Sequence, residues 1–516
     1  MKVHLMAADA DVNPTAVGDL ADPVAALAQD LQIDVLLDAM GSGDRLQRAA
    51  ARSALLSPLT SPEAVTYRQE VLADCLAHPH VPRALYDIAT RALEAERSVW
   101  WSPRFRPEMV LDRAVRVLTA QLEIIEELRA LVAQHGDTLA SPGMRAFVRT
   151  VRAELDDAGM AQLRDQLAVL ARRDTLLFAA ELAPDGQVEH PLPRTPMSAG
   201  RVFRRVALAK PRFSFTVPDR DEAGFKALEE LRDRALWRVA DAADQAAGHV
   251  HAFLEALRGE VAFYLGCLAL HERLTTVGMP VCFPQPLPVG DDDVRIECVY
   301  DPALVLTTGQ PAVTNDVHAD AVRLVVVTGA NHGGKTTLLR AIGLAHLMLG
   351  AGMFVPATAM RAALVPTVRS HWAREEDADL QHGKLDEELS RLSRLVDDLD
   401  PGALLLSNES LSSTDEAEGS RIALTLLRAL TRAGVRVVAV THLFDLAGRL
   451  YESGDPPALF LRAARGDNGQ RPYRIEPGSP LATSFARDLY EQEFGPAAEG
   501  VTSVGGNRDR LEGSHE

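Results

Sequence analysis

The chain has 516 residues, and its 54 Lys and Arg against 72 Asp and Glu give a formal net charge of −18. At about 100–200 residues per domain, this length predicts several domains. A content of 47% hydrophobic and 24% charged residues excludes a chain that is disordered throughout. No apolar run reaches the roughly 18–20 residues of a membrane-spanning helix, and the four cysteines form no CxxC pair. We therefore expect a cytoplasmic protein with no membrane partner, zinc site or disulfide framework.

The amino-terminal half is predicted to be helical. Residues 1–104 read as a core segment of short helices, and Ser61 is an expected N-cap because Pro62 and Glu63 follow it. Residues 105–275 carry longer helical patterns around a non-helical insert at about 183–220. In the first long helix, apolar residues recur at helical spacing at Leu111, Val115, Leu118, Leu122 and Ile125. Two long helices around an insert favour an antiparallel out-and-back arm, with an ordinary helical bundle as the alternative.

The pattern changes near residue 276 to short apolar runs that alternate with helical stretches. The runs lie at residues 323–327, 403–406 and 435–440. Continuous apolar strands separated by helices are typical of a parallel sheet that is buried on both faces. We predict an α/β domain over residues 276–491, followed by a disordered tail over residues 492–516 because that segment is rich in Gly, Asn and charge.

A phosphate-binding loop follows the first of these strands. The segment from Gly329 to Thr336 matches GxxxxGK[ST] and opens a helical stretch. Glycines let backbone N–H groups surround phosphates, Lys335 reaches the β- and γ-phosphates, and the Thr336 hydroxyl ligates Mg²⁺. The alternative is a glycine-rich turn with a chance lysine. The predicted nucleotide-binding residues are Gly329, Ala330, Asn331, His332, Gly333, Gly334, Lys335, Thr336 and Thr337.

The other two strands also end in polar residues. Asn408 stands where a Walker B strand normally ends in Asp, so it is the second predicted Mg²⁺ ligand, through its amide oxygen and without a negative charge. Glu409 stands where a base that polarises the attacking water is expected. His442 follows the last strand and is predicted to sense the γ-phosphate, since such strand ends face the ligand crevice. The alternatives are a polar turn and a solvated loop histidine.

Taken in order, these motifs resemble the MutS family of DNA mismatch-repair ATPases. Residues 327–337 look like the family's TGPNMGGKST, and residues 350–357 are similar to its IGSFVPA segment. Residues 409–423 can be laid without gaps on DEIGRGTSTYDGLSLA after its first Asp, and residues 441–446 resemble THYFEL. The likeness covers about residues 296–490.

The resemblance implies an ABC-type P-loop ATPase domain that uses ATP and Mg²⁺ and forms a homodimer in which each protomer completes the other's site. It also implies that residues 105–275 are a lever and clamp arm that grips DNA. The family's signature serine aligns with Asp415, so Ser412 or Ser413 is the candidate for the contact to the partner's nucleotide. Residues 67–71 and the Asn408-Glu409-Ser410 variant fit a divergent bacterial branch of the family. Because only about 100 residues precede the arm, we expect this branch to lack the mismatch-recognition domain.

A basic cluster in the insert is the candidate DNA-binding site. It comprises Arg201, Arg204, Arg205, Lys210 and Arg212. Contacts from these side chains to the DNA backbone would be independent of sequence; the alternative is a solvated basic loop. The leading function is thus a DNA-associated ATPase, related to mismatch repair or recombination, in which slow ATP hydrolysis drives dimer closure and arm movement. The alternative is a nucleotide-gated dimeric scaffold for protein partners, which the net charge favours.

Overall fold

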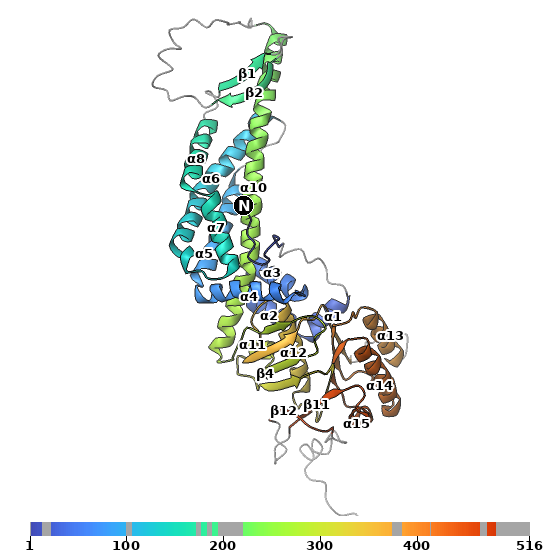
Figure 1. Cartoon of the computed structure of the whole chain (residues 1–516). Coiled ribbons are helices and arrows are strands. Elements are labelled where there is room, and N and C mark those ends of the chain that lie inside the picture. The colour runs from blue at the N-terminus through green and yellow to red at the C-terminus, as the bar shows by residue number, and fades with distance from the viewer. Residues whose placement is uncertain are drawn as a thin grey trace, which may run out of the picture.

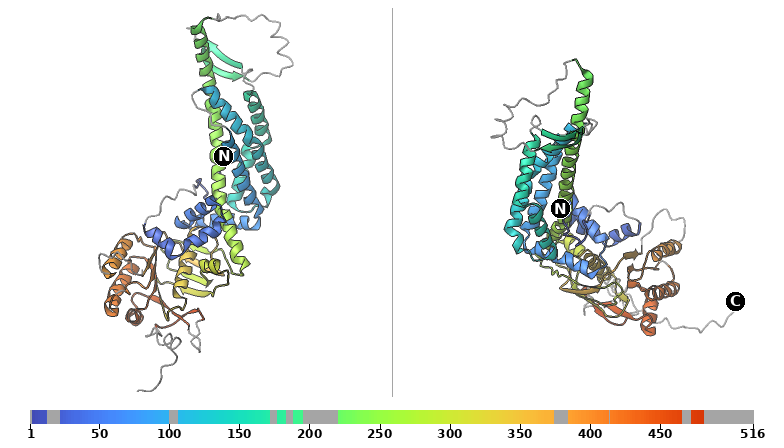
Figure 2. Two further views of the ribbon diagram at one scale, coloured as in Figure 1. Left: turned by 180° about the vertical axis from the view of Figure 1, so that it is seen from behind. Right: turned by 45° about the horizontal axis from the view of Figure 1, so that its top comes forward.

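The computed structural model of the chain describes residues 2–12, 22–99, 106–171, 177–182, 188–194, 220–373, 384–412, 414–464 and 472–480. These residues form an elongated helical arm that stands on a mixed α/β body (Figure 1). The same division is visible from behind and with the top turned forward (Figure 2). Within the described ranges, no helix is long and apolar enough to cross a membrane.

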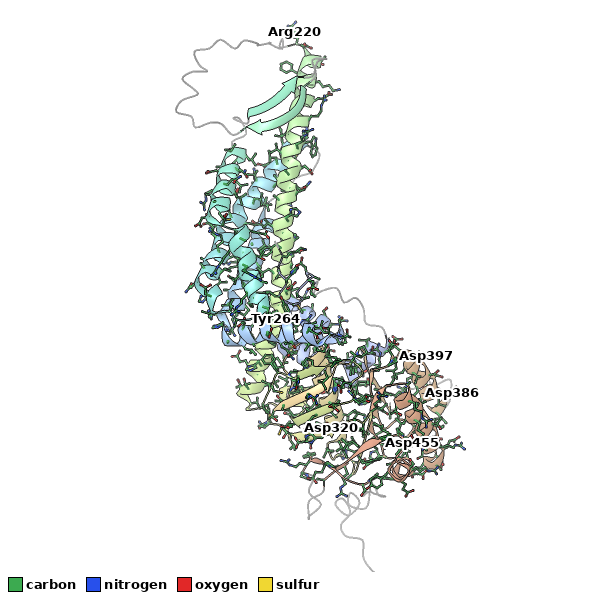
Figure 3. All side chains as sticks on the ribbon, in the orientation of Figure 1. Arg220, Tyr264, Asp320, Asp386, Asp397 and Asp455 are labelled. Carbon is green, nitrogen blue, oxygen red and sulfur yellow. The ribbon has the colours of Figure 1, made fainter. Side chains whose placement is uncertain are left out.

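Long helices build the arm. They are α5 (His80–Ser98), α6 (Pro107–His135), α8 (Asp157–Ala171) and α10 (Glu222–Thr276). The shorter elements of the arm are η1 (Gly136–Thr138), α7 (Pro142–Glu154) and an antiparallel hairpin of β1 (Leu177–Leu182) and β2 (Val188–Arg194). The hairpin lies beside the outer end of α10, near Arg220 (Figure 3). Apolar residues of α6, α8 and α10 form a continuous cluster along the arm.

The two longest helices, α6 and α10, run in the same direction. Arg106 pairs with Glu229 at 3.4 Å, and further along both helices Arg113 pairs with Asp244 at 3.6 Å. The expected antiparallel course therefore fails for α6 and α10, because helical spacing identifies a buried face but carries no information on chain direction. It holds for α8 and α10, the helices on either side of the insert, since α8 runs opposite to α6. The outward paths are α5 and α8, whose opposite direction to α6 follows from the ion pairs Arg91–Glu127, Arg113–Glu96, Arg129–Asp157 and Arg164–Glu126.

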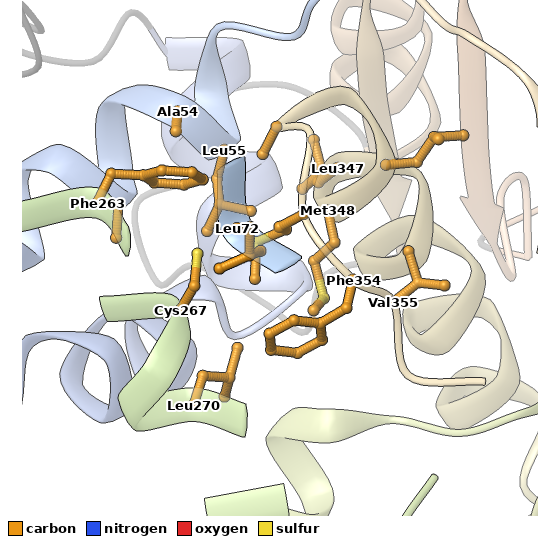
Figure 4. Packing of buried hydrophobic residues seen from close by; sticks show 14 of the residues in the cluster. Ala54, Leu55, Leu72, Phe263, Cys267, Leu270, Leu347, Met348, Phe354 and Val355 are labelled. Atoms are coloured by element: carbon orange, nitrogen blue, oxygen red, sulfur yellow. The ribbon is translucent and has the colours of Figure 1, made fainter. Parts of the chain in front are cut away.

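The inner end of α10 is embedded in the body. The short helices around it are α1 (Asp22–Asp30), α2 (Ile33–Gly41), α3 (Arg45–Leu56) and α4 (Pro62–Ala77). The expected N-cap of α4 is confirmed, because the Ser61 hydroxyl accepts the Ala64 N–H at 3.3 Å. Figure 4 shows Phe263 of α10 and Leu72 of α4 in one buried cluster with Met348 of α12 (Lys335–Gly350). This junction joins the arm to the helix that follows the phosphate-binding loop.

The body contains two sheets. The larger has the order β12-β11-β6-β10-β9-β8, parallel except for β12. Its strands are β6 (Leu324–Thr328), β8 (Val368–Trp372), β9 (Leu404–Asn408), β10 (Arg436–Val440), β11 (Ala458–Ala463) and β12 (Ile475–Pro477). The remaining helices of the body are α11 (Pro302–Thr308), α13 (Lys384–Asp397), α14 (Glu416–Arg432) and α15 (Phe444–Ser453).

The predicted parallel sheet is confirmed, including its burial on both faces. On one face Val325 and Leu404 join the large core that contains α12 and the arm junction. On the other face Val326 and Leu405 pack in a second core with α13, α14 and α15. Adjacent residues of one strand are thus buried on opposite sides, which explains the unbroken apolar runs.

A second, smaller sheet was not predicted. Its order is β3-β7-β4-β5, and its strands are β3 (Gln285–Leu287), β4 (Val294–Val299), β5 (Asn315–Ala319) and β7 (Ala359–Ala363). Along β4, buried Val294 and Ile296 alternate with exposed Arg295 and Glu297. In the sequence, such an alternation identifies a strand less clearly than an unbroken apolar run does. The mixed α/β class with a helical amino-terminal half is nevertheless as expected.

Candidate nucleotide site

The glycine-rich loop lies between β6 and α12. Its backbone needs glycine at Gly329, where φ is 122° and a Cβ atom would lie 2.9 Å from the Ala463 backbone nitrogen. Gly334 has φ 91° and directly precedes Lys335, the first residue of α12. A buried strand therefore feeds a left-handed turn and then a helix whose first N–H groups are free of intrahelical partners, which is the geometry that binds phosphate.

An open cavity of about 830 Å³ lies over this loop. Its volume falls in the range of about 300–1,000 Å³ that is typical of small-molecule sites. Seven consecutive loop and helix residues, 331–337, line one side, and Glu409 lines another. The remaining lining residues come from α11, from the segment that leads to β5 and from the segment before β12: Leu304, Pro311, Ala312, Val313, Asn315 and Tyr473. Gly329, Ala330 and His442 belong to the same region without lining the cavity.

Lys335 is buried, with 4% of its surface exposed. Its ammonium group donates hydrogen bonds to the carbonyl oxygens of Gly329 and Ala330, both at 2.9 Å. The side chain is thus folded over the loop, and its charge is held at the mouth of the phosphate-binding turn.

Thr336 and Asn408 lie next to each other. The Thr336 hydroxyl donates to Asn408 Oδ1 at 3.3 Å across the ends of α12 and β9. A hydroxyl and an amide oxygen are hard donors that suit Mg²⁺, which usually keeps several waters and takes further oxygens from substrate phosphates. Within the described residues, no group of three or more His, Cys, Asp or Glu side chains could hold a metal ion. The pair therefore fits a weakly held magnesium ion and does not fit a dedicated protein cage.

Glu409 and His442 form the charged pair of the site. His442 Nε2 lies 2.7 Å from Glu409 Oε1, and 36% of the Glu409 side chain is exposed. The hydrogen bond with His442 lowers the pKa of the Glu409 carboxyl; partial burial opposes this effect and the nearby Lys335 charge adds to it. The carboxylate is therefore ionised at neutral pH and keeps one side open to the cavity.

The candidates for a contact to a partner's nucleotide lie on the turn before α14. Ser412 is exposed there, and Ser413 lies outside the described residues. Asp415 is the N-cap of α14, since its carboxylate accepts the N–H groups of Ala417 and Glu418. This acid thus has a structural task that Ser or Thr also performs at helix starts.

The basic cluster proposed to bind DNA lies outside the described residues, as residues 195–219 are not among them. Arg220 and the start of α10 follow it directly at the outer end of the arm (Figure 3). The DNA contact therefore remains a prediction.

Sequence reasoning missed the apolar rim of the cavity. Leu304 and Val313 are unusually exposed for aliphatic residues, at 37% and 41%, and Tyr473 is exposed at 52%. Asn315 links the rim together, because its side chain accepts the Ile475 N–H at 2.7 Å and donates to the Tyr473 carbonyl at 3.4 Å. No sequence pattern identified Leu304, Val313 or Tyr473 as rim residues, since they come from three separate segments.

Two family models match the chain. The model described as MutS2 N-terminal domain matches residues 60–277, and the model described as MutS domain V matches residues 325–455. The chain is 31% identical over 133 residues to a protein named Endonuclease MutS2 from Shouchella clausii, which covers 26% of this chain and 17% of the relative. It is 32% identical over 190 residues to a protein of that name from Anaeromyxobacter sp., which covers 36% of this chain and 23% of the relative. The chain is thus matched to less than a quarter of the length of these relatives.

Proposed function

Because the chain belongs to the MutS family, we propose that it is a DNA-associated ATPase whose nucleotide site is the cavity over the loop at residues 329–337. The observation that carries this proposal is the position of Glu409, which is hydrogen-bonded to His442, on the same cavity as that loop. A phosphate-binding turn alone indicates binding, whereas an ionised carboxylate on the same cavity supplies the group that hydrolysis requires.

The cavity has separate places for the two ends of ATP. The backbone N–H groups of the loop and the Lys335 ammonium bind the phosphates. The base packs on the apolar rim, where Leu304 and Val313 offer aliphatic surface and Tyr473 an aromatic ring. Binding requires Lys335 to exchange its hydrogen bonds with loop carbonyls for bonds with phosphate oxygens.

Hydrolysis depends on Glu409. Its carboxylate accepts a hydrogen bond from the attacking water, and His442 holds that carboxylate in orientation through Oε1. Thr336 and Asn408 would hold Mg²⁺, which neutralises the charge on the phosphoryl oxygens when bound. Since Asn408 is neutral where a carboxylate is usual, magnesium affinity and turnover are both low.

The movement that hydrolysis drives passes to the arm. We assign residues 276–491 to an ABC-type ATPase domain, residues 105–275 together with α5 to the lever and clamp arm, and the rest of residues 1–104 to the helical core. The buried cluster that joins α12 to α10 supports this assignment, because packed cores transmit small displacements. In the homodimer, the exposed turn at Ser412 contacts the partner's nucleotide, and dimer closure moves the arms on DNA.

The test is steady-state hydrolysis of Mg-ATP by the full chain, with and without duplex, branched or mismatched DNA at low salt. The Lys335→Ala variant is the control for contaminating ATPases, because it removes the cation that binds the phosphates. We expect the wild-type chain to hydrolyse ATP at a rate that changes when DNA is added. We expect no hydrolysis by Lys335→Ala. ATP hydrolysis that persists in Lys335→Ala contradicts the assigned site. An absence of DNA binding at low salt contradicts the proposal that DNA is the partner.

A second function, a nucleotide-gated scaffold for protein partners, is favoured by the net charge of −18. The body carries exposed acidic residues on several sides, among them Asp320, Asp386, Asp397 and Asp455 (Figure 3). Such a surface repels nucleic acid. ATP hydrolysis that DNA leaves unchanged, together with no DNA binding, would support this function over the first.

A further inference from the structure

The turn that carries Glu409 has a strained backbone. Glu409 has φ 57° and Leu411 has φ 62°, both in the left-handed region. That region is unfavourable for a non-glycine residue and persists only where surrounding contacts impose it. Leu411 is 1% exposed, so protein contacts enclose this strained residue on all sides. The contacts that hold this turn therefore fix the position of the Glu409 carboxylate.

The strongest of these contacts comes from α13. Glu388 is 5% exposed, and its Oε1 accepts the Leu411 N–H at 2.6 Å. At 2.6 Å, this donor–acceptor distance is shorter than the roughly 2.9–3.0 Å of a typical N–H···O hydrogen bond. On the other side of the turn, the Glu409 N–H donates to the Val440 carbonyl at 2.8 Å, which ties the turn to β10.

The residue between the two strained positions is held as well. Ser410 Oγ lies 2.6 Å from Nδ1 of His371 and 2.7 Å from the hydroxyl of Ser407. His371 is 4% exposed on β8, the neighbour of β9 in the sheet. Helix α14 closes the remaining side, since a Cβ atom at Gly419 would lie 2.7 Å from the Leu411 carbonyl oxygen.

We propose that Glu388 is a positioning residue for hydrolysis. It acts through Leu411 and contributes no atom to the cavity lining. By holding Leu411 in the left-handed conformation, it presents the preceding carboxylate to His442 and to the attacking water. This inference rests on the proposed function, because it assumes that Glu409 orients that water.

The test compares the Glu388→Ala, Glu388→Gln and Glu387→Ala variants of the full chain. We expect Glu388→Ala to lower kcat by about 10²-fold, the effect of a displacement near 1 Å in a catalytic group, with the affinity for ATP unchanged. Glu388→Gln keeps an acceptor oxygen and restores most of this loss. Glu387 is the matched control, because it is exposed on the same helix and its truncation leaves kcat unchanged.

Making Glu388→Ala in the Glu409→Gln variant distinguishes a positioning role of Glu388 from a purely structural one. There the water-orienting carboxylate is already gone, so Glu388→Ala is expected to cause no further loss of turnover. A wild-type kcat in Glu388→Ala overturns the proposal, and so does a loss of equal size in both backgrounds or a parallel loss of ATP affinity. If Glu409→Gln alone turns over like the wild type, the proposed function fails and this inference fails with it.

Ser410→Ala keeps the proposal testable if Glu388→Ala does not fold. It removes the hydroxyl that joins His371 and Ser407, and one such hydrogen bond lost from the turn lowers kcat about fivefold. Unchanged kcat in Ser410→Ala, both alone and in combination with Glu388→Gln, would overturn the proposal.

Discussion

Two glutamates mark the two functional regions of the molecule, and they differ in what surrounds them. Glu260 of α10 lies at the junction between arm and body and is 0% exposed. Its carboxylate accepts three backbone N–H groups from the amino-terminal segment, residues 2–12, at 2.7, 2.9 and 3.1 Å. Glu409 is 36% exposed at the side chain and binds His442 on one side only.

The difference separates a carboxylate that is enclosed by backbone contacts from one that is open to a cavity. Both oxygens of Glu260 are occupied by groups that cannot leave without unfolding the amino-terminal segment. Glu409 retains an open side towards a cavity that contains Lys335. Burial raises the pKa of Glu260, whereas the hydrogen bond with His442 lowers the pKa of Glu409. Only the second arrangement leaves an ionised group available to a substrate.

The largest expected effect on stability comes from removing the buried carboxylate. Glu260→Ala leaves two buried N–H groups and one partly buried N–H group without an acceptor, so we expect the free energy of unfolding to fall by about 3–5 kcal/mol. Urea unfolding followed by circular dichroism measures this change. Glu272→Ala is the matched control, since Glu272 is exposed on the same helix. A loss below about 1 kcal/mol would show that Glu260 is not the anchor of the amino-terminal segment.

A smaller loss is expected at Arg68 of α4, the cation of the same junction. Arg68 donates to the carbonyl oxygens of Met6 at 3.1 Å and Ala351 at 2.9 Å, and its guanidinium lies over the Phe263 ring. Arg68→Met orphans both carbonyls but also removes a buried charge, so the expected loss is about 1–3 kcal/mol. The exposed Arg45 provides the control Arg45→Met. Equal stability of the two variants would contradict a role for Arg68 in joining α4 to α12.

The smallest effect is on the pH dependence of stability, and its sign differs between the two glutamates. The raised pKa of Glu260 means that its ionisation costs stability as the pH rises above the ordinary glutamate value, about 4.3. The lowered pKa of Glu409 means that its ionisation adds stability above that value, which is lost as the pH falls through the folded pKa.

Urea unfolding between about pH 4 and about pH 7 checks these signs. As the pH falls, the wild type should gain stability relative to Glu260→Gln and lose stability relative to Glu409→Gln. The same trend in both variants would contradict the assignment of opposite environments to the two carboxylates.

Much of the fold was predictable, because its signals are local. The unbroken apolar run at Leu404 and Leu405 identifies a strand buried on both faces, and Ser61 with Pro62 identifies a helix start. The parallel course of α6 and α10 was not predictable. It depends on which faces meet, such as Arg113 against Asp244, and a single helix pattern does not encode its partner.

The site divides in the same way. The loop around Lys335 is contiguous in sequence, so the motif alone located it between a strand and a helix. Tyr473 reaches the cavity from a separate segment. Glu388 acts through a hydrogen bond to a backbone 23 positions away. Neither residue type nor spacing marks such contacts, because they exist only after the sheet and its covering helices have assembled.

The central claim is that Glu409 acts in ATP hydrolysis, whereas Glu260 anchors the amino-terminal segment. The most direct test is the turnover of Glu409→Gln at saturating Mg-ATP. Loss of a positioned general base lowers kcat by about 10²–10⁴-fold, and we predict a loss in this range with ATP affinity kept. The control is Glu452→Gln, an exposed glutamate of α15. Wild-type turnover in Glu409→Gln would contradict the claim.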